Sequence, residues 1–355
     1  MGIPDDTNEA VKETVAFVDD LKFAVSEKIK LTAKFDKICI CGMGGSAIGG
    51  DLLVDLMVQA SAVPMTVVRF PDIPNWVNDK TFVIVCSYSG NTKETISMYE
   101  QAVKRGCNIV VMTSGGVLKQ KCIEDGKMLI QLKEGIQPRN SLGLIIGYLA
   151  NIMETLGVAK CRKDMKKLIP DLNKLRNKIG FKNPDSYAKK IAAQIYGSIP
   201  VIYSTSGITA SAIRWKSQIN ENSKMLAFNG SIPEINHNEI VGWSEGIKKF
   251  NCLPVFLYEE DAPDVMKHMA NASIDTLRSS GVSPVVVVIR GKTVMERSLR
   301  AVMFGDYISL YLAFMNGVDP IEVRSIVTFK EKVANLLSKR AERVKKKKKA
   351  PPKHI

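Results

Sequence analysis

A dense run of hydroxyl and amide side chains, the stretch SYSGNT, follows a strand-like apolar segment at residues 82–86. The hydroxyls of Ser87, Ser89 and Thr92 can donate hydrogen bonds to phosphate oxygens, and Gly90 lets the backbone bend close to a ligand. A helix expected to begin near Thr92 adds the positive end of its dipole. An ordinary turn with an N-cap also favours Ser, Asn and Thr, but one capping residue would suffice for that. The stretch therefore predicts an anion site.

A second turn, GMGGSAIGGD, follows the first strand-like run of the chain and places Gly45 and Ser46 at the start of a helix. Residues 42–47 alone fit the G-x-G-x-x-A pattern of dinucleotide-binding proteins, so an NADP-dependent oxidoreductase is an alternative. Such a protein usually carries an acidic residue after its second strand, where this chain has Arg69, and it has no use for the hydroxyl turn. Two polar turns side by side suit one compact phosphate better.

The elements that must position these turns alternate between short β-branched runs and helical patterns, which predicts parallel sheets with crossover helices. In the first half we expect strands at 37–41, 64–68, 82–86, 108–112 and 127–132, with helices at about 8–30, 46–59, 92–105 and 141–156. The second half repeats the pattern, with strands at 199–207, 224–230, 253–258 and 283–289 and helices at about 208–221, 263–279 and 296–315. The chain is thus predicted to be an α/β protein with two doubly wound domains, at 1–156 and 186–338, joined by a helical linker at 157–185.

The corresponding loop of the second half differs in chemistry. Where the first half has hydroxyls after its third strand, the second has Glu259, Glu260 and Asp261. Because three carboxylates repel a phosphate, we expect only the N-terminal domain to keep an anion site.

The net charge of +14 could indicate a nucleic-acid-binding protein, but it is unevenly distributed. Residues 339–355 hold nine Lys or Arg and one Glu, so this segment has a net charge of +8 out of the net +14 of the whole chain. We expect it to be a basic, disordered tail, and nucleic acid is an unlikely partner.

No apolar run has the length of a membrane span, and the start of the chain is acidic rather than like a signal peptide. The seven cysteines are odd in number and mostly sit in apolar runs, as expected of reduced thiols in a cytoplasmic protein. Cysteines and histidines show no metal-ligand spacing, so no metal is expected.

Six separated motifs resemble, in order, the bifunctional phosphoglucose/phosphomannose isomerase family of the phosphoglucose isomerase superfamily. They are GMGGSAIGGD, SYSGNTKET, QPRNSLG, RWKSQINENSK, NHNEIVGW and FMNGVDPIEV, and the similarity runs from about residue 37 to 330. The resemblance implies two sugar-isomerase (SIS) domains and a cofactor-free, metal-free enzyme. Its reaction would interconvert glucose 6-phosphate, and also mannose 6-phosphate, with fructose 6-phosphate through an enediolate.

The resemblance also implies roles for individual residues. Glu221 matches the base that moves the proton between C2 and C1, and Arg139 matches the arginine that faces the enediolate. His237 matches the ring-opening acid and base, which the other subunit of a homodimer supplies in this family, and Lys330 matches a lysine that reaches the ring. The family's phosphate ligands correspond to Ser46, Ser87, Ser89 and Thr92. A non-catalytic sugar-phosphate sensor is the remaining alternative, although it would need none of the first three residues.

Overall fold

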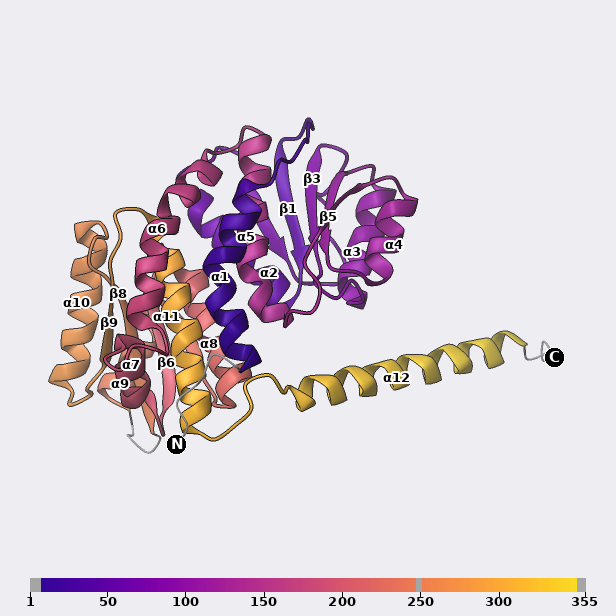
Figure 1. The fold of residues 1–355 in the computed structure, drawn as a ribbon. Coiled ribbons are helices and arrows are strands. Elements are labelled where there is room, and N and C mark those ends of the chain that lie inside the picture. The colour runs from indigo at the N-terminus through magenta and orange to yellow at the C-terminus, as the bar shows by residue number, and fades with distance from the viewer. Residues whose placement is uncertain (1–7, 247–250, 350–355) are drawn as a thin grey trace. The chain divides into compact units, whose positions relative to one another are not determined.

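The computed structural model describes residues 8–246 and 251–349 and contains two wholly parallel sheets flanked by helices (Figure 1). The first sheet has the strand order β2-β1-β3-β4-β5 and the second the order β7-β6-β8-β9. This confirms the predicted α/β class with doubly wound parallel sheets. The strands of the first sheet are β1 (Lys37–Gly42), β2 (Met65–Val68), β3 (Thr81–Cys86), β4 (Asn108–Thr113) and β5 (Met128–Gln131), and those of the second are β6 (Ile199–Thr205), β7 (Phe228–Ile232), β8 (Cys252–Glu259) and β9 (Val285–Ile289).

Both sheets change winding direction beside their first strand, where β1 pairs with β3 and β6 pairs with β8. In an open parallel sheet the loops that leave such neighbouring strands diverge to opposite faces and leave a crevice for ligands. The register pairs Gly42 with Cys86, so the carboxyl ends of β1 and β3 lie side by side. All six residues of β3 are buried, as the continuous apolar run predicts.

Helices cover the sheets and connect the two halves. The helices are α1 (Glu9–Ser26), α2 (Gly44–Met57), α3 (Lys93–Lys104), α4 (Gly116–Glu124), α5 (Leu142–Thr155), α6 (Cys161–Ile179), α7 (Tyr187–Ile195), α8 (Thr209–Ser223), α9 (Glu239–Ser244), α10 (Asp264–Ser279), α11 (Val294–Met315) and α12 (Arg324–Lys349), with 3-10 turns η1 (Pro138–Ser141) and η2 (Glu234–His237). The sequence pattern missed the long helix α12, of 26 residues, and three helices of at most nine residues, α4, α7 and α9.

Strand β7 begins four residues later than expected. Lys224 is the C-cap residue of α8 and has a left-handed conformation, with φ of 56°. The residues that follow it connect α8 to β7. The expected strand at 224–230 is therefore shifted to Phe228–Ile232.

Helix α6, in the predicted linker, packs against α1, α5 and α11 and lies beside them in Figure 1. Residues up to Pro320 form one compact unit, and residues from Ile321 form a second. Helix α12 belongs to the second unit and spans both the predicted domain end at 338 and the start of the predicted tail, of which 350–355 lie outside the described residues. Within the described residues, no helix is both long and apolar enough to cross a membrane.

Candidate active site

The glycine-rich phosphate turn predicted at GMGGSAIGGD follows β1 and forms the start of α2. Gly44 has φ of +49°, and Ser46 accepts a hydrogen bond from the backbone N–H of Tyr88 at 3.1 Å. That bond joins this turn to the hydroxyl turn after β3. A Cβ on Gly45 would lie 3.0 Å from both the Arg139 Cα and the Pro138 carbonyl oxygen, so the turn also packs directly against η1.

The hydroxyl turn lies between β3 and α3. The Ser87 hydroxyl lies 3.3 Å from that of Thr92, and the Ser89 hydroxyl accepts a weak bond from the Asn91 N–H at 3.4 Å. Ser87 is buried, Thr92 is half-buried and Ser89 is exposed. Gly90 has φ of +65°, and a Cβ there would lie 1.8 Å from the Gly115 carbonyl oxygen, so only glycine fits this turn.

The two helices that begin at these turns lack side-chain caps within the described chain. Thr92 is the N-cap residue of α3 and Met43 that of α2, yet neither side chain bonds a first-turn N–H. Asn8, Ser186 and Thr293 cap α1, α7 and α11, whereas α4, α8 and α10 also begin without a side-chain cap. Uncapped first-turn N–H groups and the positive helix ends suit an anion placed between the two turns.

Arg139 lies in the 3-10 turn η1, which follows β5, and is almost fully buried. Its Nε donates to the Asn222 Oδ1 at 2.8 Å and its Nη2 donates to the Pro320 carbonyl oxygen at 2.6 Å. Burial lowers the pKa of Arg139, and the charge of Glu221 opposes this change. The guanidinium is thus held in a fixed orientation.

Glu221 lies near the C-terminus of α8, with its Oε2 3.7 Å from the Nη1 of Arg139. Two residues predicted separately, from opposite halves of the chain, therefore face each other. The side chain of Glu221 is 30% exposed, whereas that of Arg139 is 5% exposed. The carboxylate remains open to a ligand above a buried cation.

Helix α8 is fixed in place by α11. Arg214 forms a bidentate ion pair with Asp306, at 2.9 and 3.0 Å, and both side chains are buried. The indole N–H of Trp215 donates to the Ala301 carbonyl oxygen at 2.6 Å, and a Cβ on Gly305 would lie 2.4 Å from the Trp215 ring. This close packing determines where α8 presents Glu221.

Two positioning residues escaped the sequence analysis. Asn222 holds Arg139 and donates to the Ser309 hydroxyl of α11 at 2.9 Å. Glu13 of α1 accepts a bond from the Gln137 N–H at 3.1 Å and one from the Asn140 side chain at 2.6 Å. Asn222 stands next to Glu221 in the motif, which was the available signal, whereas nothing in the sequence around Glu13 marks it.

Two other residues, His237 and Lys330, were predicted to be catalytic. His237 ends η2 and is exposed, and within the described chain it forms no hydrogen bond or ion pair with Arg139 or Glu221. Lys330 is exposed on α12, which belongs to the second unit. The described residues contain no group of three or more His, Cys, Asp or Glu that could hold a metal ion.

The equivalent end of the second sheet is occupied by the protein's own carboxylates. Glu259 is buried and pairs with Arg297 at 2.6 Å, and Thr205 donates its hydroxyl to the same carboxylate. Glu260 pairs with Arg290, and Asp261 accepts a bond from the Gly291 N–H at 2.8 Å.

Asp55 of α2 accepts the Ala210 N–H at the first turn of α8 at 2.7 Å. Burial raises the pKa of Asp55 to about 7. A carboxylate of the protein thus also lies against the start of α8. In the other half, Arg69, which stands where a dinucleotide-binding protein usually has an acidic residue, pairs with Asp51.

Comparison with known proteins gives a consistent result. Residues 184–333 match the family model described as the bacterial phospho-glucose isomerase C-terminal SIS domain. A protein of Caldicellulosiruptor bescii named bifunctional phosphoglucose/phosphomannose isomerase is 35% identical over 325 residues, which cover 88% of this chain and 95% of the relative. One of the same name from Aquifex aeolicus is 36% identical over 300 residues, covering 83% and 90%. A crystal structure of a hypothetical protein from Thermus thermophilus superposes with a TM-score of 0.73 at 15% identity, covering 92% of this chain and 90% of that one, which shows the fold alone.

Proposed function

The chain belongs to the bifunctional phosphoglucose/phosphomannose isomerase family, and on this premise we propose that Glu221 and Arg139 form its catalytic centre. The protein is an aldose–ketose isomerase that interconverts glucose 6-phosphate and mannose 6-phosphate with fructose 6-phosphate. The relatives lend no support to the alternative of a non-catalytic sensor. The observation that carries the proposal is the partly exposed Glu221 carboxylate 3.7 Å from a buried, oriented guanidinium.

In this proposal the substrate phosphate binds between the turns at 44–46 and 87–92. It accepts hydrogen bonds from hydroxyls and from uncapped helix N–H groups. Because Gly45 packs against Arg139, a sugar chain that extends from the phosphate reaches η1 and the end of α8. This arrangement presents the reacting carbons to Glu221.

The reaction then moves two protons, the carbon-bound one from C2 to C1 and the hydroxyl one from O2 to O1. The Glu221 carboxylate removes the proton from C2 of the open-chain aldose. The electrons of the broken C–H bond form a C1–C2 double bond, and the former carbonyl oxygen at C1 takes the negative charge of the resulting enediolate. Arg139 stabilises that negative charge, which appears only along the reaction path. Glu221 returns the carbon-bound proton to C1, and the hydroxyl proton of O2 is transferred to O1, so that C2 becomes the ketone carbon and C1 carries the new hydroxyl group. Substrate and product have the same overall oxidation state, so the steps require no redox cofactor.

Ring opening precedes this step, and we assign it to His237 supplied by a second copy of the chain. Its exposure on η2 is compatible with such a role. The assignment makes a homodimer necessary for activity. Lys330 is proposed to reach the sugar ring, and the cytoplasm is the proposed location.

The decisive experiment replaces Glu221 by Gln, which keeps the size of the side chain and removes its basicity. We expect kcat for fructose 6-phosphate to fall about 10²–10⁴-fold, with substrate binding retained in calorimetry. Glu124→Gln, a change at an exposed glutamate on α4, is the matched control and should behave as the wild type. Wild-type turnover by Glu221→Gln would remove Glu221 from the mechanism.

Sharing of the site between subunits has its own test. Glu221→Gln and His237→Ala proteins should each have strongly reduced activity, but mixing them under conditions that exchange subunits should restore part of the wild-type activity. Mixed dimers verified by mass spectrometry that show no recovery would contradict a shared site.

A further inference from the structure

Tyr88 stands inside the hydroxyl turn, between Ser87 and Ser89, and is buried, with 7% of its surface exposed. Its N–H donates to the Ser46 hydroxyl at 3.1 Å, and its carbonyl oxygen accepts a bond from the Ser114 N–H at 2.9 Å. The backbone of Tyr88 is therefore tied to both phosphate turns.

The side chain of Tyr88 binds a different segment, the loop between β5 and η1. Its hydroxyl donates to the Lys133 carbonyl oxygen at 2.9 Å and accepts a bond from the Ile136 N–H at 2.8 Å. Burial raises the pKa of Tyr88, so the hydroxyl keeps its proton and can make both bonds. One side chain thus joins the hydroxyl turn to the loop that leads into η1.

That loop ends at a contact with Arg139. Gln137, the residue after Ile136, accepts a bond from the Arg139 Nη1 on its side-chain Oε1 at 3.4 Å. The same Nη1 lies 3.7 Å from the Glu221 carboxylate. A chain of contacts therefore runs from the phosphate turns through Tyr88 and Gln137 to the atom of Arg139 that faces the proposed base.

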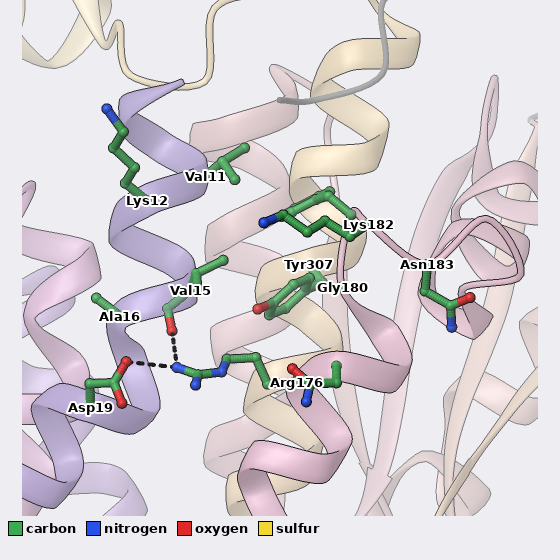
Figure 2. A pocket seen from close by; sticks show the side chains of 12 residues that line it. Val11, Lys12, Val15, Ala16, Asp19, Arg176, Gly180, Lys182, Asn183 and Tyr307 are labelled. Carbon is green, nitrogen blue, oxygen red and sulfur yellow. Dashed lines mark hydrogen bonds and ion pairs between the residues drawn. The ribbon is translucent and has the colours of Figure 1, made fainter. Parts of the chain in front are cut away.

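The second support of Gln137 comes from α1. The Gln137 N–H donates to the Glu13 carboxylate at 3.1 Å. Arg176 of α6 ties α1 in place, since it donates to the Val15 carbonyl oxygen at 3.1 Å and pairs with Asp19 at 2.7 Å (Figure 2). Glu13 therefore holds Gln137 whether or not a phosphate is bound, whereas the tyrosine hydroxyl links this loop to the phosphate turns.

We propose that Tyr88 is a positioning residue that carries the effect of a bound phosphate to Arg139. A phosphate between the two turns fixes the backbone of Tyr88, the hydroxyl then fixes residues 133–136, and Gln137 holds the Arg139 Nη1 toward Glu221. Part of the binding energy of the phosphate thereby lowers the barrier to proton transfer instead of only lowering KM. Because this role lies within the isomerase reaction, it rests on the proposed function.

The test supplies the phosphate separately from the sugar. D-xylulose is fructose 6-phosphate without C6 and its phosphate, and it keeps the two carbons between which the proton moves. Phosphite dianion replaces the missing phosphate. In the wild type, saturating phosphite should raise kcat/KM for isomerisation of D-xylulose to D-xylose by at least about tenfold, measured by proton NMR. In Tyr88→Phe the increase should be less than about threefold, through the remaining contact of Gly45 with η1.

Tyr88→Phe keeps the ring, and the groups that lose a partner lie in a loop where Lys133 is exposed and Ile136 half-buried, so water can bind them and the fold should persist. Tyr99→Phe is the matched control. Its hydroxyl donates to the Asp125 carboxylate at 2.7 Å in the same domain and lies outside this chain of contacts. This control should lose stability and keep the full activation by phosphite.

Gln137→Ala tests the next contact of the chain. It should reduce the activation by phosphite as Tyr88→Phe does, and the double variant should lose no more than the larger single effect, because both side chains act in series. Effects of the two substitutions that multiply would overturn the proposed chain.

Fructose 6-phosphate gives a second readout. In Tyr88→Phe its kcat should fall at least about fivefold while KM changes less than about threefold. Absence of activation in the wild type, equal activation in Tyr88→Phe, or an equal loss in Tyr99→Phe would each overturn the inference. An incorrect isomerase assignment would instead appear as fructose 6-phosphate turnover that survives Glu221→Gln, so the two failures are distinguishable.

Discussion

Replacing Asn222 by Ala should separate the placement of Arg139 from its presence. The substitution removes the acceptor of the 2.8 Å bond from the Arg139 Nε but leaves the 2.6 Å bond from Nη2 to the Pro320 carbonyl oxygen. Arg139 should therefore stay near η1 and lose its fixed orientation toward Glu221.

The magnitude follows from the bond that is lost. A hydrogen bond to a charged group contributes about 1.5–3 kcal/mol. If that energy serves to orient the guanidinium toward the enediolate, kcat should fall about 10–100-fold, since about 1.4 kcal/mol corresponds to a factor of ten. The KM for fructose 6-phosphate should change less than about threefold, because the phosphate turns are untouched.

The assay is coupled isomerisation of fructose 6-phosphate, run well below the melting temperature so that only folded enzyme is measured. Asn220→Ala is the matched control, because it also removes a side-chain acceptor on α8, the one that binds the Ala227 N–H at 2.9 Å, without touching Arg139. Asn222→Ala also loses the bond to Ser309, so we expect lower stability as well. Wild-type kcat in Asn222→Ala, with only stability reduced, would refute the reasoning.

Two further substitutions test the phosphate turn and the contact between α2 and α8. Gly90→Ala puts a methyl group 1.8 Å from the Gly115 carbonyl oxygen and should raise KM more than tenfold. Gly126→Ala, at a similar φ of +59° with no atom within 4 Å, should leave KM unchanged in the same assay. Because burial raises the pKa of Asp55 from 3.8 to about 7, the folded state holds this proton more tightly than the unfolded chain, and stability should fall as pH rises from about 4 to about 7. Asp55→Asn keeps an acceptor for Ala210, so in urea unfolding it should match the wild type at pH 4 and exceed it by up to about 4 kcal/mol at pH 8. Equal stability of the two proteins at both pH values would contradict a buried, protonated Asp55.

Strands and turns were predictable because their signals are local. Runs of β-branched residues mark β1 and β3, and the parallel order places their carboxyl ends together, so Ser46 and Ser87 were expected at one edge of the sheet. The bond from the Tyr88 N–H to Ser46 agrees with that expectation. The start of β7 was predicted wrongly, because the local pattern does not show that Lys224 is the C-cap residue of α8.

The meeting of Arg139 with Glu221 depends on contacts between distant segments, which no local pattern encodes. The family resemblance named both residues, but the packing of α8 on α11 brings the carboxylate to the guanidinium. Asn222 and Glu13 support Arg139 through ordinary hydrogen bonds, and their residue types are equally common on solvent-exposed helix faces. The roles of His237 and Lys330 stay predictions.

A crystal structure of the protein with fructose 6-phosphate tests the central claim most directly. We predict that the phosphoryl group lies between residues 44–46 and 87–92 and that C1 and C2 lie about 3–3.5 Å from the Glu221 carboxylate, as a proton transfer requires. A phosphoryl group bound elsewhere, or a sugar chain directed away from Glu221 and Arg139, would contradict the account.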